Sequence, residues 1–153
     1  MPNYDFVEVD PITALVRRAT CSHNELGPVI TREFTAIVEA NPDAELVGAP
    51  MAVYLEWREH DCDVEMAMPV DPNSVPGAGT ELKTYPSCSA VHATHTGPYE
   101  GLYGAWMNLW AELQSNNVVV GGAPPWDAYT VGAEDDPNPD TWITDLYIPL
   151  LKL

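Results

Sequence analysis

The carboxylate best suited to binding chemistry is Asp145, in the stretch ITDLYIPL, which also contains Tyr147 two positions later. If this stretch is a strand, alternation puts Ile143, Asp145 and Tyr147 on one face and Leu146 on the other. A buried acid among such neighbours needs a partner or a raised pKa, because an isolated charge is expensive to desolvate. Two interpretations stay open: the acid of a ligand pocket, or a solvated edge charge or one paired with an arginine.

Aromatic side chains are the second group with binding chemistry. Aromatic faces attract organic cations, and a nearby carboxylate adds Coulomb attraction, so a cleft that combines them suits a flat cationic ligand. The predicted ligand-binding residues are Asp145, Tyr54, Trp106, Tyr103, Trp110, Tyr129, Tyr147 and Glu65. Trp106 and Trp110 lie four apart on a helical stripe, and such a stripe is more typical of packing than of binding. Of the whole set, we place Tyr54, Trp106 and Asp145 first.

Metal and nucleophile chemistry find little support in the sequence. His92 and His95 lie three apart on a predicted strand and so point to opposite faces, and HDCD, residues 60–63, is typical of a polar hairpin. The three cysteines show no CxxC spacing, and no G-x-S-x-G elbow is present. We therefore predict no metal site, no cofactor and no assigned catalytic residue.

Two helices are predicted to position these side chains. Apolar residues follow a helical period from Asn24 to Asn41 and again from Tyr99 to about Leu113. Each helix has a Gly-Pro pair near its start, Gly27-Pro28 and Gly97-Pro98, and a proline costs little in a first turn. We interpret the second pair as a copy of the first, at the hinge between strand and helix.

The same order of elements occurs twice along the chain. Extended runs precede the helices at 12–20 and 89–96, and Gly-Ala-Pro, a strand with a central tyrosine (Tyr54, Tyr129) and an acid-x-x-x-Pro strand follow them. Glu65 is the counterpart of Asp145, and Tyr54 and Glu56 are expected to share a strand face. The pattern predicts an α+β fold in which a strand-helix-strand-strand module is duplicated, giving an antiparallel sheet, two helices and a pseudo-twofold central cleft. The repeats, about 5–70 and 88–151, form a single domain, 1–153, joined by a Pro- and Gly-rich linker over 71–88.

Charge narrows the classes of partner. Six Lys and Arg against 23 Asp and Glu give a net charge of -17, which repels a nucleic-acid backbone. The same charge attracts cations, but it is equally typical of adaptation to a salty medium or of simple solubility. No apolar run reaches the roughly 18 residues of a membrane span, and no signal peptide is evident, so we expect a cytoplasmic protein with no direct nucleic-acid or membrane partner.

The second half resembles the GyrI-like small-molecule-binding family, which includes effector-binding domains of AraC-type and MerR-type multidrug regulators. The resemblance rests on the Gly-Pro-Tyr helix start, the PPWDAYTV strand and the closing TWITDLYIP strand, and it is traceable over Val7 to Val70 as well. It implies a cleft where two repeats meet, with a glutamate at its bottom on the final strand. The matching residue is Asp145, one methylene shorter.

This resemblance implies a free-standing member and three hypotheses for its function. The first is binding of amphipathic, cationic small molecules, such as a drug or effector, in a cleft that includes Asp145. The second is hydrolysis of cyclopropane-bearing genotoxins, in which Glu65 or Asp145 activates water and Tyr54 or another tyrosine supplies a proton. The third is a gyrase-type inhibitor that acts on a protein partner, supported by charge alone.

Overall fold

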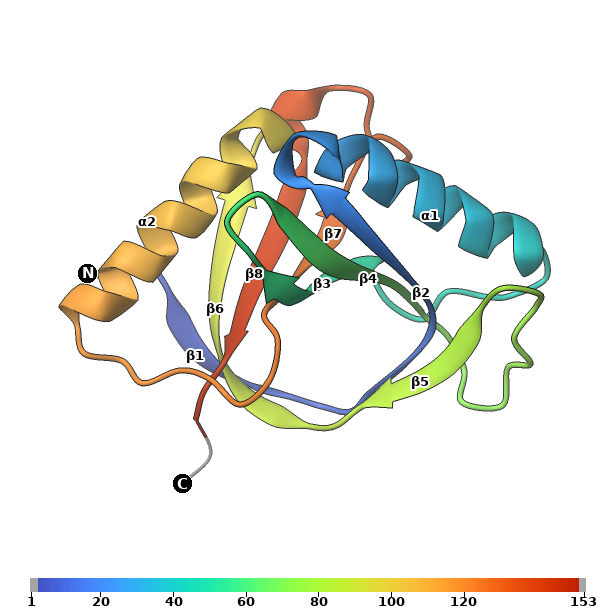
Figure 1. Cartoon of the computed structure of the whole chain (residues 1–153), viewed down its shortest axis with the longest axis horizontal. Helices are drawn as coiled ribbons and strands as arrows, with labels where there is room; N and C mark the ends of the chain where they lie inside the picture. The colour runs from blue at the N-terminus through green and yellow to red at the C-terminus, as the bar shows by residue number, and fades with distance from the viewer. Residues whose placement is uncertain (1–2, 152–153) are drawn as a thin grey trace. The chain divides into compact units, whose positions relative to one another are not determined.

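The computed structural model describes residues 3–151, which fall into two compact units. Unit 1 comprises residues 1–9 and 88–153, and unit 2 comprises residues 10–87. Each unit joins one α-helix to four antiparallel strands, so the predicted α+β fold with two helices is confirmed (Figure 1). Neither helix among the described residues is long and apolar enough to cross a membrane.

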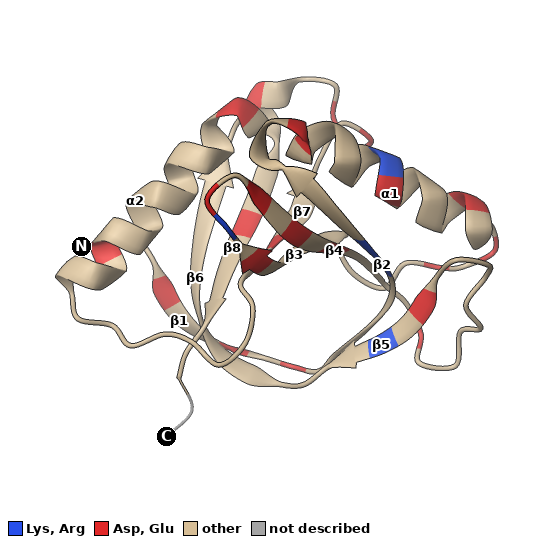
Figure 2. Cartoon of the chain, viewed as in Figure 1, with Lys and Arg blue, Asp and Glu red and all other residues tan. Residues whose placement is uncertain are grey.

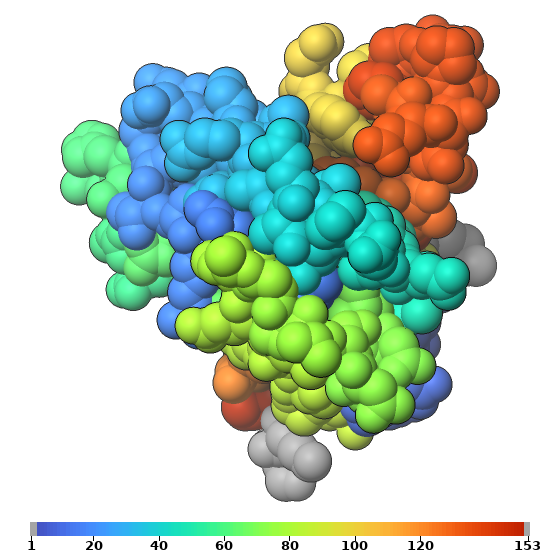
Figure 3. Space-filling view, turned by 90° about the vertical axis from the view of Figure 1, so that its right-hand side faces the viewer, coloured from blue at the N-terminus to red at the C-terminus, as the bar shows by residue number. Residues whose placement is uncertain are grey.

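Unit 2 is built on the first predicted helix. Its strands lie in the order β3-β4-β2-β5, and all neighbours run antiparallel. Its elements are β2 (Ile12–Ser22), the 3-10 turn η1 (His23–Glu25), α1 (Leu26–Ala40), β3 (Met51–Trp57), β4 (Asp61–Pro69) and β5 (Glu81–Tyr85). In Figure 3, α1 runs across the surface of this unit as the blue-to-cyan segment. Its buried apolar side chains are Val29 and Ile37, which lie about two turns apart on the same face of the helix.

Unit 1 is built on the second predicted helix. Its strands lie in the order β7-β8-β6-β1, again antiparallel throughout. Its elements are β1 (Asp5–Val9), β6 (Cys88–Thr96), the 3-10 turn η2 (Tyr99–Gly101), α2 (Leu102–Ser115), β7 (Trp126–Val131), the 3-10 turn η3 (Pro139–Thr141) and β8 (Ile143–Pro149). Leu109 and Leu113 of α2 pack on Val91, Leu146 and Ile148, and this cluster is the core of the unit.

The two units repeat one strand order. β3, β4 and β2 correspond to β7, β8 and β6, so the predicted strand-helix-strand-strand module is confirmed in both. Each module also has a fourth strand that the sequence analysis missed: β5 in unit 2 and β1 in unit 1. The expected linker over 71–88 therefore contains a strand. That the repeats act as one domain with a cleft between them stays a prediction.

The Gly-Pro pairs are not equivalent, contrary to expectation. Pro98 lies immediately before η2, whereas Pro28 is the third residue of α1. Gly97 does have a role of its own: its φ of 122° favours glycine, and its N–H donates to the Trp142 carbonyl over 2.8 Å. The duplication rests instead on the strand order and on paired closing contacts, in which Val47 and Gly121 donate to the carbonyls of Pro69 and Pro149.

Bulges interrupt β3 and β7 at matching places, after Tyr54 and after Tyr129. In β3 the bulge shifts the register so that Tyr54 lies opposite Val64 and Glu56 lies opposite Asp63. Because Val64 and Asp63 are adjacent, Tyr54 and Glu56 lie on opposite faces of the sheet. The expectation that they share a face is wrong for this reason.

Candidate functional site

Asp145 lies on the face of the unit 1 sheet that is turned away from α2. The burial of β8 alternates, with Thr144, Leu146 and Ile148 buried on the helix side and Asp145 and Tyr147 partly buried on the other. The predicted alternation is confirmed. β8 lies between β6 and β7, so Asp145 is not an edge charge.

Asp145 is held by three side-chain donors from the neighbouring strands. Its Oδ1 accepts from His92 Nε2 over 2.8 Å and from Thr94 Oγ1 over 3.0 Å, and its Oδ2 accepts from Thr130 Oγ1. Burial would raise the pKa of Asp145, but the hydrogen bonds from Thr130, His92 and Thr94 outweigh it and hold the pKa below its usual range. The lowered pKa keeps the carboxylate ionised near neutral pH, and the side chain keeps 16% of its surface exposed.

Aromatic rings adjoin this carboxylate on the same face. Tyr147 stacks on Trp126, with ring centroids 4.8 Å apart and planes 13° from parallel, and the His92 ring lies 5.0 Å from Tyr147. Trp126 faces Tyr147 across β7 and β8 in register. We call this set the Asp145 face; it comprises Asp5, His92, Thr94, Trp126, Thr130, Asp145 and Tyr147.

The other predicted residues of unit 1 lie on or beyond the helix side of the sheet. Trp106 donates its indole N–H to Asp127 over 3.1 Å, and Tyr129 lies opposite Thr144, edge-on to Tyr99. Tyr103 and Trp110 are exposed on α2, by 65% and 36%. The structure therefore brings Asp145 together with Tyr147, and does not bring either together with Trp106, Tyr129, Tyr103 or Trp110.

Glu65 occupies in unit 2 the place that Asp145 has in unit 1, but its surroundings differ. It is fully buried and accepts from Arg18 Nε over 2.7 Å, from Lys83 Nζ over 2.8 Å and from the Tyr85 hydroxyl. Burial would raise the pKa of Glu65, but the donors Lys83, Tyr85 and Arg18 hold it below its usual value. Burial and the adjacent Glu65 carboxylate together raise the pKa of Tyr85. This acid is fully occupied by the protein's own groups.

Tyr54 lies on the opposite face of the unit 2 sheet from Glu65. It faces Val64 in register, on the side where Arg17 bonds Glu33 of α1 over 3.1 Å, whereas Glu65 faces Arg18 and Val53. A mechanism that pairs Glu65 with Tyr54 as water activator and proton donor is therefore not assembled in this unit. A shallow hollow of about 260 Å³, lined by Arg18, Ala19, Thr20, Leu55 and Asp63, adjoins the Glu65 side.

Sequence reasoning missed His92, Trp126 and Asp127. His92 and His95 do point to opposite faces as predicted, with His95 Nε2 against the Pro98 carbonyl, but His92 reaches Asp145. Asp127 is fully buried in the strand WDAYTV, where the argument used for Asp145 applies equally. Among residues 3–151, no group of three or more His, Cys, Asp or Glu side chains is placed to hold a metal ion.

Charge is distributed unevenly between the units. Unit 2 holds five of the six Lys and Arg residues. Unit 1 holds ten acids and, over 3–9 and 88–151, no Lys or Arg (Figure 2). These ten acids are Asp5, Glu8, Glu100, Glu112, Asp127, Glu134, Asp135, Asp136, Asp140 and Asp145. The Asp145 face therefore lies in a field that favours cations.

Solved structures share this fold at low sequence identity. The EcmrR–DNA complex matches with a TM-score of 0.82 and 21% identity over 98% of this chain, which spans 57% of that chain. The isolated EcmrR C-terminal domain matches with a TM-score of 0.79 and 22% identity, over 98% of both chains. SAV2435 bound to tetraphenylphosphonium matches with a TM-score of 0.76 and 13% identity, over 97% of this chain and 93% of that one.

A search of curated protein sequences gives no match. The model of the GyrI-like small molecule binding domain matches residues 2–151, nearly the whole chain. With the repeated module and its two strand acids, this match identifies the chain as a member of the GyrI-like small molecule binding domain family.

Proposed function

We propose that this protein binds lipophilic organic cations and that Asp145 supplies the charge that attracts them. The observation that carries the proposal is the ionised, partly exposed carboxylate of Asp145 beside the Trp126–Tyr147 stack. A carboxylate attracts the ligand charge and aromatic faces attract both the charge and apolar rings. The absence of Lys and Arg from residues 3–9 and 88–151 supports the same sign of charge, as does the tetraphenylphosphonium bound to SAV2435.

Glu65 is not the proposed ligand acid. Arg18 and Lys83 already neutralise it, and its side chain has no exposed surface. A second ligand cation there would have to displace one of the protein's own cations. The two corresponding acids therefore have different roles in the proposal: Glu65 pairs with the protein's own cations, and Asp145 pairs with the charge of the ligand.

Calorimetric titration of the full chain with tetraphenylphosphonium tests the proposal. We expect binding, and a roughly tenfold weaker Kd in Asp145→Asn, because a unit charge at a partly exposed site contributes on the order of 1–2 kcal/mol. Asp145→Glu keeps the charge and should bind more tightly than Asp145→Asn. The Kd for neutral triphenylphosphine oxide should be similar in the wild type and in Asp145→Asn.

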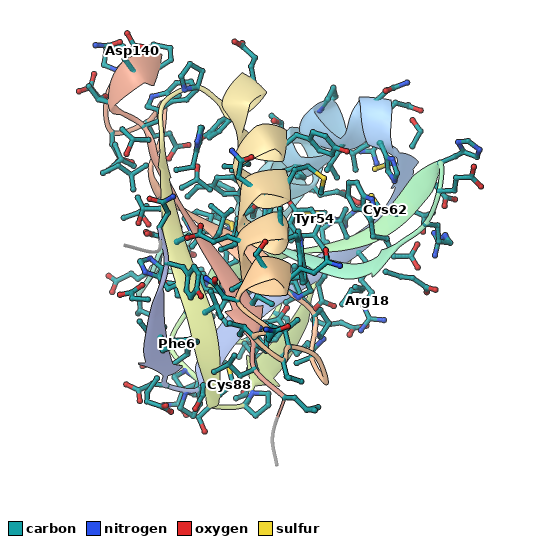
Figure 4. The ribbon with its side chains drawn as sticks, turned by 90° about the vertical axis from the view of Figure 1, so that its left-hand side faces the viewer. Phe6, Arg18, Tyr54, Cys62, Cys88 and Asp140 are labelled. Carbon is teal, nitrogen blue, oxygen red and sulfur yellow. The ribbon has the colours of Figure 1, made fainter. Side chains whose placement is uncertain are left out.

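Asp140→Asn is the matched control. Asp140 is an exposed acid of the same unit, and its loss changes the net charge equally. It lies in η3, and Figure 4 draws it and Cys88, the first residue of β6, at opposite ends of the unit. Its affinity should stay within about twofold of wild type. No measurable binding of the cation, or equal losses in the Asp145→Asn and Asp140→Asn proteins, would refute the proposal.

A further inference from the structure

His92 lies between two carboxylates, one at each ring nitrogen. Its Nε2 is 2.8 Å from Asp145 Oδ1, and its Nδ1 is 2.9 Å from Asp5 Oδ1 of β1. The ring keeps 22% of its side-chain surface exposed. The function proposed above leaves this histidine without a role, although it occupies the side of Asp145 that faces β6.

With Asp5 and Asp145 both ionised, the geometry requires both ring nitrogens of His92 to carry protons. An ionised carboxylate can only accept hydrogen bonds, and a neutral imidazole has only one N–H to donate. Both bonds form together only when the ring carries both protons and a positive charge. The groups that face it are Asp5 from β1 and Asp145 and Tyr147 from β8, with Thr94 alongside on β6, and none of these is a cation.

The direction of the pKa agrees with this geometry. Burial alone would lower the pKa of His92, but its hydrogen bonds to Asp145 and Asp5 outweigh burial and raise the pKa above the usual value of 6.5. With His92 protonated, the chain Asp5–His92–Asp145 carries a net charge of about -1, and with His92 neutral it carries about -2.

We propose that the His92 imidazolium is an internal cation that competes with the ligand for Asp145, so that binding of a lipophilic cation releases the second ring proton of His92 to solvent. This inference rests on the proposed function and names the residue that sets the preference of the site for ligand charge. A cation placed at Asp145 lies near the imidazolium and repels it. The neutral ring keeps one N–H for one carboxylate, and the other carboxylate is left to the ligand.

Proton release makes the affinity depend on pH with a definite sign. Since the free protein holds the proton and the complex does not, a higher pH favours the complex. Affinity for a permanent cation should therefore rise with pH through the titration of His92, by at most about tenfold per pH unit for one proton. A neutral ligand has no reason to expel the proton, and its affinity should stay flat.

The test uses tetraphenylphosphonium, whose charge does not change with pH, and the full chain. Calorimetric titrations from pH 5.5 to 8.5, in buffers of different ionisation enthalpy, give both the Kd and the number of protons released. We expect Kd to tighten with rising pH and protons to be released. His92→Gln should abolish both effects and should bind the cation more tightly than wild type at low pH, a gain that loss of a merely structural residue would not produce.

His60→Gln is the matched control, because His60 is 88% exposed in unit 2 and its loss should leave the pH dependence intact. Affinity that does not vary with pH in wild type, or a pH dependence that persists in His92→Gln, overturns the inference while leaving the proposed function standing. Absence of binding at every pH overturns both.

A measurement on the wild type without ligand tests the inference even if a variant does not fold. Titration of the histidine ring signals by NMR gives the pKa of His92 directly in the wild type. It should lie above the usual value and fall in both the Asp5→Asn and the Asp145→Asn protein. A wild-type pKa at or below the usual value overturns the inference whatever the ligand does.

Discussion

Glu65→Gln is expected to destabilise the protein markedly, although it changes one atom and keeps the shape of the side chain. Glu65 has no exposed surface and accepts from Arg18, Lys83 and Tyr85. The glutamine amide turns an NH₂ group toward one of these donors and removes the charge that the two cations share.

The size of the loss follows from the exposure of the partners. Hydrogen bonds to a charged group contribute about 1.5–3 kcal/mol each, and breaking a buried ion pair on one side costs about 3–5 kcal/mol. Arg18 is 66% exposed and Lys83 is 35% exposed, so water can solvate both after the change. We therefore expect a loss of about 2–4 kcal/mol in the free energy of unfolding.

Urea denaturation followed by circular dichroism measures this loss. With a slope of about 2 kcal/mol per M for a protein of this size, the midpoint should fall by about 1–2 M. Glu81→Gln is the matched control, because Glu81 is exposed on β5 near Arg18, and its loss should cost no more than about 0.5 kcal/mol. Equal midpoints for Glu65→Gln and wild type would refute the reasoning.

The pH dependence of the same variant carries a definite sign. The folded pKa of Glu65 lies below its ordinary value of 4.5, so its stabilising contribution is complete above that pH and is lost as the pH falls through the folded pKa. Glu65→Gln has no such contribution to lose. The difference in stability between wild type and variant should therefore narrow in acid, and a difference that stayed constant below pH 4 would contradict the assignment.

Three further outcomes are expected from other parts of the chain. Burial raises the pKa of the fully buried Cys62 thiol to about 12, so it should resist a thiol reagent at pH 8 in the native protein and react once the chain is unfolded in urea. Gly104→Ala should raise the free energy of unfolding by about 0.5–1 kcal/mol in thermal melts, because this position of α2 has open space for a Cβ. Gly77→Ala should lower it, because the new Cβ would lie 2.0 Å from the Ala40 carbonyl oxygen and force the backbone to move.

The fold could be predicted where a local pattern determined it. The helical periods, the MAVYLEW strand and the repeated order of elements all follow from apolar spacing and turn residues, and the structure has them. β1 and β5 could not be found in this way. Each has five residues, and each is stabilised by pairing with a strand distant in sequence, β6 or β2 respectively, rather than by its own pattern.

The site could be predicted along a strand but not across strands. Alternation alone put Asp145 with Tyr147 and away from Leu146. His92 reaches Asp145 diagonally, because His92 lies opposite Tyr147 and Thr94 lies opposite Asp145. That register depends on how β6 and β8 align, and the bulge after Tyr54 shows how one inserted residue can reverse a face.

Under the proposed function, the two strand acids would give a duplicated module two roles from one position. Glu65 and Asp145 occupy corresponding places on β4 and β8, each on the face turned away from its helix. Around Glu65 the partners are Arg18 and Lys83, and arginine and lysine are residue types whose positive charge does not depend on pH in the physiological range. Around Asp145 the only cationic partner among the described residues is His92, whose charge can be removed. On the proposal made above, a permanent partner makes the acid structural, whereas a titratable one leaves it able to exchange its partner for a ligand.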